Sequence, residues 1–145
     1  MYRILLVEDD KSIVTNLTEI LQHEGFLVDS AEGQASALAR IEAQPYDLVL
    51  LDISLKDGNG FGVCTAIRQT VGTPVIFLTA SGDEFSVVTG LDLGADDYIA
   101  KPFRPRELVS RMKSVLRRSG NQASSLFEYE GISIDTSRGY VTKNG

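Results

Sequence analysis

The stretch Leu48-Val49-Leu50-Leu51-Asp52 decides the fold. Four consecutive apolar residues predict a strand that is buried on both faces, and such strands belong to parallel sheets covered by helices. The run ends in a carboxylate, at the sheet edge where open α/β proteins bind their ligands. A second run, Ile4-Leu5-Leu6-Val7, ends in Glu8-Asp9-Asp10 in the same way. Acids gathered at one edge repel each other, so the pattern indicates a site that a cation or a proton compensates.

Short apolar runs alternate with segments of helical periodicity along most of the chain. We expect strands at 3–8, 26–31, 47–52, 74–79 and 97–101, and helices at about 11–24, 34–43, 60–70, 84–92 and 104–118. In the first predicted helix, Ile13, Leu17 and Ile20 share one apolar face. Five strand–helix units predict an α/β fold, a doubly wound five-stranded parallel sheet with helices on both faces.

Composition and charge exclude several classes of protein. The 145 residues carry a net charge of −6, which argues against non-specific binding of nucleic acid. No apolar stretch approaches the ~18 residues that span a bilayer, so we expect no membrane association. Met1 is followed almost at once by the first strand, which predicts no signal peptide. The single cysteine, Cys64, indicates a reducing compartment and a cytoplasmic protein.

The pattern changes after Arg118. Residues 119–125 are small and polar and predict a flexible linker, whereas residues 126–145 alternate with period 2 and predict a short antiparallel β segment. Such a short meander is not stable alone, so it either packs on the first domain or begins a second one. Asn144-Gly145 is a hairpin signal with no following strand and favours a second, incomplete domain.

Residues of several predicted strand ends form one chemical constellation. Glu8 and Asp9 follow the first strand, and Asp52, Thr79 and Lys101 end the third, fourth and fifth. Neighbouring carboxylates suit Mg²⁺, which takes one or two carboxylates and keeps several waters. A lysine and a hydroxyl suit the oxygens of a phosphoryl group. The set therefore predicts a site where a carboxylate accepts a phosphoryl group.

Four motifs together resemble the receiver domain of two-component response regulators. They are Ile4–Asp10, Asp47–Asp52, Pro74–Ala80 and Gly94–Phe103, and the resemblance covers residues 2–118. It implies a flavodoxin-like sheet with the strand order 2-1-3-4-5. Arg104–Arg111 and Phe127–Ile132 further resemble the OmpR/PhoB subfamily of transcription regulators. We therefore expect a receiver domain at 1–118, a linker at 119–125 and the start of a winged-helix effector domain at 126–145.

The resemblance implies a role for each site residue. Asp52 would be phosphorylated by a sensor histidine kinase, and Lys101 would hold a phosphoryl oxygen. Mg²⁺ would be bound by Glu8, Asp9, Asp52 and the backbone carbonyl of Ser54. Thr79 and Tyr98 would be the switch pair, and the Lys101-Pro102 bond is a candidate for the cis form. Asp10 is adjacent to the metal pair, but a helix cap is the more ordinary role for it.

The subfamily also implies a homodimer through one face of the receiver domain, formed by the predicted helix 84–92, strand 97–101 and helix 104–118. Its residues would be Val88 and Leu91 at the centre, with ion pairs across the dimer between Asp97 and Arg111 and between Asp92 and Lys113. Two positions depart from the family. Val87 stands where a basic residue usually faces Glu107, and Lys56-Asp57 replaces Pro-Gly, which predicts a more mobile loop after Asp52.

The main hypothesis is a phosphorylation-activated transcription regulator that reaches promoter DNA only through the missing part of its effector domain. It would catalyse its own phosphorylation and dephosphorylation without being a turnover enzyme. One alternative is a stand-alone receiver that acts in a phosphorelay or as an interaction module. Another is a phosphatase, but Ser54 stands where such enzymes carry an acidic general acid. A flavodoxin-like cofactor binder is disfavoured because no phosphate-binding loop follows the first strand.

Overall fold

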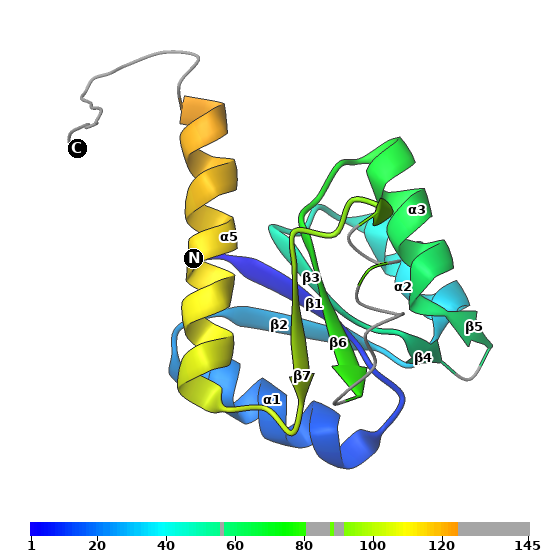
Figure 1. Ribbon diagram of the computed structural model, residues 1–145, viewed down its shortest axis with the longest axis horizontal. Coiled ribbons are helices and arrows are strands. Elements are labelled where there is room, and N and C mark those ends of the chain that lie inside the picture. The colour runs from blue at the N-terminus through cyan, green and yellow to red at the C-terminus, as the bar shows by residue number, and fades with distance from the viewer. Residues whose placement is uncertain (56, 81–87, 89–91, 125–145) are drawn as a thin grey trace. The chain divides into compact units, whose positions relative to one another are not determined.

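A computed structural model describes residues 1–55, 57–80, 88 and 92–124 of the chain. The chain divides into two compact units, Met1–Lys113 and Ser114–Gly145. The first unit contains the whole β-sheet (Figure 1). The second unit is described as far as Ser124 and consists there of the continuation of a helix.

The first unit is built on a parallel sheet with the strand order β2-β1-β3-β6-β7. The strands are β1 (Arg3–Val7), β2 (Leu27–Ala31), β3 (Leu48–Asp52), β6 (Val75–Ala80) and β7 (Asp97–Lys101). Counted along the sheet strands alone, this is the predicted order 2-1-3-4-5. The central strand β3 is buried over its full length, as its apolar run predicts. The predicted fold class is therefore confirmed.

Helices cover both faces of this sheet (Figure 1). Helices α2 (Gln34–Ala43) and α3 (Gly60–Thr70) pack over the face to which Leu5, Val49 and Phe77 contribute. Helix α1 (Lys11–His23) and the first part of α5 (Pro105–Ser124) lie over the opposite face. Because successive side chains of a strand point to opposite faces, the residues that alternate with Leu5, Val49 and Phe77 along their strands belong to this second face.

The helix ends follow local capping rules. Asp10 accepts hydrogen bonds from the N–H groups of Ser12 and Ile13 and so caps α1. Asn59 caps α3 by accepting from the N–H of Gly62 at 3.0 Å. Both residue types are preferred at this position because their short side chains reach the first unpaired amides. The role of Asp10 as a helix cap agrees with the more ordinary of its two interpretations.

The last helix is longer than predicted. Helix α5 continues to Ser124 and includes most of the segment 119–125 that we predicted as a linker. No proline interrupts this segment, and adding residues to an existing helix costs far less than starting one. The domain boundaries therefore stay predictions. The predicted β segment at 126–145 lies outside the described residues, as does most of the predicted helix 84–92.

A small antiparallel hairpin, which the sequence analysis did not predict, follows Asp52. It pairs β4 (Ser54–Leu55) with β5 (Gly58–Asn59), in the loop that leads from the central strand to α3. Within the part of the chain that the structure describes, no helix is long and apolar enough to cross a membrane.

Candidate functional site

The register of the sheet brings the predicted site residues to one edge. Val7 pairs with Leu51, Asp52 pairs with Leu78, and Ala80 pairs with Lys101. Because successive side chains of a strand point to opposite faces, Glu8, Asp52 and Lys101 belong to the face covered by α1. Thr79 and Tyr98 belong to the opposite face. The sequence thus separates the charged residues from the predicted switch pair.

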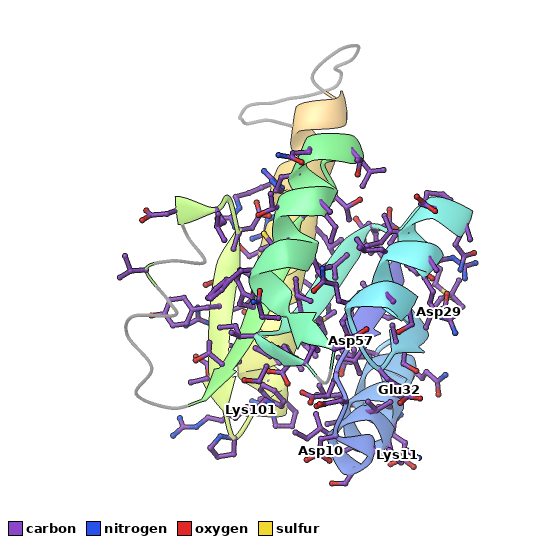
Figure 2. The ribbon with its side chains drawn as sticks, turned by 90° about the vertical axis from the view of Figure 1, so that its right-hand side faces the viewer. Asp10, Lys11, Asp29, Glu32, Asp57 and Lys101 are labelled. Atoms are coloured by element: carbon purple, nitrogen blue, oxygen red, sulfur yellow. The ribbon has the colours of Figure 1, made fainter. Side chains whose placement is uncertain are left out.

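Glu8, Asp52 and Lys101 form a charge cluster in which the two acids are buried and the lysine is half-buried. Lys101 Nζ lies 3.0 Å from Glu8 Oε1 and 3.4 Å from Asp52 Oδ2. Figure 2 shows Lys101 at the same end of the molecule as Asp10, which begins α1. One lysine therefore faces two acids in a region where water provides little screening.

The cluster shifts the ionisation of its members. Burial and the neighbouring Asp52 carboxylate raise the pKa of Glu8 from 4.5 to about 7, against the opposing effect of Lys101. Burial lowers the pKa of Lys101, but the contact with Glu8 and the charge of Asp52 outweigh burial, so the pKa is raised. Glu8 is therefore partly protonated near neutral pH, and a further cation beside it would favour its ionised form.

The same edge offers oxygen ligands for a metal ion. One carboxylate oxygen from each of Glu8, Asp9 and Asp52 lies within 4.8 Å of the other two. Glu8 Oε1 is buried, and it forms no hydrogen bond with any residue that the structure describes. Its ion pair with Lys101 leaves it able to accept a further cation. Hard oxygen ligands around an acidic site fit Mg²⁺, so the residues present suit the predicted ion.

The remaining predicted site residues lie around this cluster. Thr79 is buried in β6, and Tyr98 is 37% exposed on β7. Ser54 begins the hairpin, and its N–H donates to Asp52 Oδ1 at 3.4 Å. The Lys101-Pro102 peptide bond is cis, as predicted. The structure thus brings the predicted acids and the lysine into contact at one edge of the sheet.

A comparison with models of protein families identifies the domain that carries this site. The model of the response regulator receiver domain matches residues 4–113. The chain belongs to the response regulator receiver family. The resemblance on which the sequence analysis relied is thereby confirmed for the receiver domain.

Known proteins extend the match over the whole chain. The chain is 42% identical over 143 residues to the DNA-binding response regulator MtrA of Mycolicibacterium paratuberculosis, covering 99% of this chain and 64% of that protein. It is 42% identical over 146 residues to the response regulator ArlR of Staphylococcus haemolyticus, covering 100% and 65%. A solved two-component response regulator from Clostridium difficile has a TM-score of 0.79 at 32% identity, covering 82% of this chain and 98% of that one. The chain thus spans slightly less than two thirds of the two curated relatives.

The receiver domain carries a second charge cluster on the predicted dimer face. Arg111 Nη1 lies 2.9 Å from Asp97 Oδ1, and Arg111 Nη2 lies 3.1 Å from Glu107 Oε2. Lys113 Nζ lies 3.8 Å from Glu24 Oε1. Asp97 and Arg111, which were predicted to pair across a dimer, thus pair within one chain here. Val88 and Asp92 are exposed, and Leu91 lies outside the described residues.

An apolar groove adjoins the charge cluster of the receiver domain. Its cavity volume is about 540 Å³. Helix α1 contributes Ile13, Leu17 and Ile20 to its lining, and the segment after β7 contributes Pro102 and Phe103. Lys101 lines the groove as well and connects it with Asp52. The groove was not predicted, although the apolar face of the first helix was.

Asp57 has a role that its sequence context, a loop predicted to be more mobile, does not indicate. Its carboxylate accepts hydrogen bonds from the N–H groups of Gln34 and Ala35, the first two residues of α2. These bonds lower the pKa of Asp57 below its usual value. The only sequence signal is Gly33, a residue without a capping side chain at the start of a predicted helix.

Proposed function

We propose that this chain is the regulatory part of a phosphorylation-activated transcription regulator, with Asp52 as the residue that accepts the phosphoryl group. The observation that carries the proposal is the contact of Lys101 with both Glu8 and Asp52 at the carboxyl edge of the sheet. A receiver domain of a two-component system implies a histidine kinase as phosphoryl donor. The curated relatives named above are DNA-binding response regulators or response regulators, which supports the same reading for the whole protein.

The reaction at Asp52 follows from the groups around it. A carboxylate oxygen of Asp52 attacks the phosphorus of a phosphohistidine, so that a P–O bond forms and the P–N bond breaks. The electron pair of the broken bond stays on the imidazole nitrogen. Lys101 is placed to bind a phosphoryl oxygen as charge develops there, because its ammonium already lies 3.4 Å from Asp52 Oδ2.

Mg²⁺ held by Glu8, Asp9, Asp52 and the Ser54 carbonyl would supply positive charge next to the phosphoryl oxygens. Glu8 must be ionised to act as a ligand, and its raised pKa couples metal binding to the loss of a proton. Asp52 would also be dephosphorylated by water at the same site. The domain would therefore catalyse both steps of its own modification without turning over a separate substrate.

The output of the switch rests on residues away from the cluster. Thr79 would move toward the phosphoryl group, and Tyr98, now partly exposed, would turn inward. This change would favour a homodimer through Val88, Leu91, Asp92, Asp97, Arg111 and Lys113. The dimer would bring together two effector domains for promoter DNA. The reduced single cysteine and the family support a cytoplasmic location.

The apolar groove beside Lys101 is a suitable docking surface for the kinase. A protein that delivers phosphohistidine to Asp52 must cover the surface around Lys101, and the groove is lined there by α1 and the segment after β7. We expect Ile20→Glu to lower transfer from a phosphorylated histidine kinase. The same variant should accept a phosphoryl group from acetyl phosphate at the wild-type rate, because that donor is too small to use the groove.

Acetyl phosphate and Mg²⁺ test the acceptor assignment directly. Intact-mass measurement should show one added phosphoryl group on the wild-type chain and none on Asp52→Ala. Asp47→Asn is a suitable control, because Asp47 accepts the Arg3 N–H at the start of its strand, away from the carboxyl edge. Labelling of Asp52→Ala to the wild-type extent would mean that another residue is the acceptor.

A further inference from the structure

One carboxylate, that of Asp57, links the hairpin that follows Asp52 to helix α2 through hydrogen bonds. Asp57 Oδ1 accepts the N–H of Gln34 at 2.7 Å, and Asp57 Oδ2 accepts the N–H of Ala35 at 3.2 Å. The first amides of a helix have no partner within the helix, and a carboxylate there also interacts well with the helix dipole. Figure 2 shows Asp57 between the hairpin and the first turn of α2. Asp57 thus caps a helix that belongs to a different part of the chain.

Gly33, the residue before α2, leaves room for this contact. A Cβ atom at Gly33 would overlap the Asp57 carboxylate and lie 2.9 Å from its Cγ. The backbone of Gly33 has φ −157° and ψ −171°, an extended conformation that any residue adopts. Space, not backbone conformation, therefore requires glycine at this position. A larger residue at 33 would displace the carboxylate of Asp57 while leaving its charge on the protein.

The other end of the hairpin is continuous with the phosphoryl acceptor. The N–H of Gly60 donates to the carbonyl of Ile53 at 2.8 Å, and the N–H of Ser54 donates to Asp52 Oδ1. A Cβ atom at Gly60 would overlap the backbone carbonyl of Asp52. The hairpin is thus held at its base beside Asp52 and near its tip by Asp57. Ser54, whose carbonyl is the proposed ligand of Mg²⁺, lies between these two points of attachment.

We propose that Asp57 is a positioning residue that holds the hairpin in the conformation that binds Mg²⁺. The inference rests on the proposed function, because it assigns the metal site to the same edge. A hairpin that is already ordered loses less conformational entropy when its carbonyl becomes a ligand. Release of Asp57 therefore weakens Mg²⁺ binding. It leaves phosphoryl transfer at saturating Mg²⁺ unchanged, since Asp57 contacts neither Asp52 nor Lys101 in the described structure.

Two variants with different charges test the proposal. Asp57→Asn removes the carboxylate, and Gly33→Ala displaces it but keeps its charge, so agreement between them separates positioning from long-range attraction of the cation. Calorimetric titration with Mg²⁺ should show a dissociation constant raised about three- to tenfold in both variants. The rate of labelling by acetyl phosphate at saturating Mg²⁺ should stay within about twofold of wild type. Hydrogen exchange of the Gln34 and Ala35 amides should become faster in both variants.

A double variant and a control complete the test. Because both changes act on one contact, Gly33→Ala should add nothing to Asp57→Ala. Asp47→Asn removes one acidic charge and a hydrogen bond to the Arg3 N–H away from the metal site, and should keep the wild-type Mg²⁺ affinity.

Two outcomes separate this inference from the proposed function. If amide exchange rises in the variants while the Mg²⁺ dissociation constant stays at the wild-type value, Asp57 does not position the metal site and the inference is wrong. A fall in the maximal labelling rate without a change in Mg²⁺ affinity also overturns it. A wild-type chain that binds no Mg²⁺ contradicts the proposed function itself.

Discussion

Two charge clusters in this receiver domain each combine one basic and two acidic side chains, and they differ in burial. Lys101 faces Glu8 and Asp52 at the sheet edge, and Arg111 faces Asp97 and Glu107 on the predicted dimer face. The acid side chains of the first cluster are 1% and 8% exposed, whereas those of the second are 23% and 47% exposed. The number of charges is therefore the same, and the access of water is not.

Burial explains why only the first cluster suits chemistry. At the sheet edge, desolvation and a like charge hold the pKa of Glu8 near 7, so the cluster gains from any further cation. At the exposed cluster, water screens the charges, and such pairs contribute about 0–1 kcal/mol. We therefore expect changes at the sheet edge to affect binding and reaction strongly, and changes at the exposed cluster to adjust association weakly.

The largest effect is expected for Lys101→Ala. The variant leaves Glu8 and Asp52 facing each other without their cation and removes the proposed donor to the transferred phosphoryl group. Labelling by acetyl phosphate should become about 100-fold slower, the usual loss when one such donor is removed. Rates measured by intact mass at saturating Mg²⁺ check this expectation.

Arg68→Ala is the matched control for that measurement. Arg68 also pairs with an acid, Asp96 at 3.6 Å, but at the end of α3 away from the acceptor. It should label at the wild-type rate. A Lys101→Ala variant that labels as fast as Arg68→Ala would show that the lysine is not needed for the transfer.

A smaller effect, on stability, is expected for Glu8→Gln without metal. The folded pKa of Glu8, about 7, lies above its ordinary value of 4.5, so the folded state favours the protonated form. Its contribution to stability is fully present below about pH 4.5 and is lost as pH rises through about 7. Glutamine does not ionise, so at about pH 8 the variant should be more stable than wild type by on the order of 2 kcal/mol.

Urea unfolding in the presence of a chelator measures this difference. At about pH 4 the two proteins should unfold at similar urea concentrations, because Glu8 is then protonated in both states. Addition of Mg²⁺ at about pH 8 should stabilise wild type more than Glu8→Gln, since only wild type keeps the proposed carboxylate ligand at position 8 beside Asp9 and Asp52. An equal stability gap at both pH values would contradict the burial argument.

The buried cluster was predictable from sequence because its causes are local. The apolar run at 47–52 predicts a central strand, observed at Leu48–Asp52, and parallel strands necessarily bring their terminal acids to one edge. The contact of Asp57 with α2 was not predictable, because it joins two segments that no local pattern relates. The hairpin around it is equally short of local signals, with two residues in each strand.

The end of α5 shows a different limit of sequence reasoning. Small polar residues after Arg118 suggested a linker, yet none of them forbids a helix that has already formed.

The ion pairs show a third limit of sequence reasoning. The resemblance predicted which charges lie on the dimer face, but a sequence does not say whether Asp97 and Arg111 pair within one chain or between two chains.

A modest effect on association is expected for Arg111→Ala. Dimerisation through the proposed face would exchange the Asp97–Arg111 contact within the chain for the same contact across the dimer. Loss of this exposed pair should raise the dimer dissociation constant about threefold to fivefold. Sedimentation with beryllofluoride and Mg²⁺ measures it, and Arg68→Ala again serves as the control. An unchanged dimer fraction would exclude Arg111 from the interface.

The smallest effect is expected for Glu107→Gln. Glu107 holds Arg111 through an i,i+4 pair at 3.1 Å, and Val87 replaces the basic residue that usually faces it. Loss of this exposed pair should lower the free energy of unfolding by only about 0.3–0.5 kcal/mol. Because the change releases Arg111 toward Asp97, the beryllofluoride dimer should become slightly tighter. In the background of Arg111→Ala, Glu107→Gln should then change nothing, and a further shift there would mean that Glu107 has a partner of its own across the dimer.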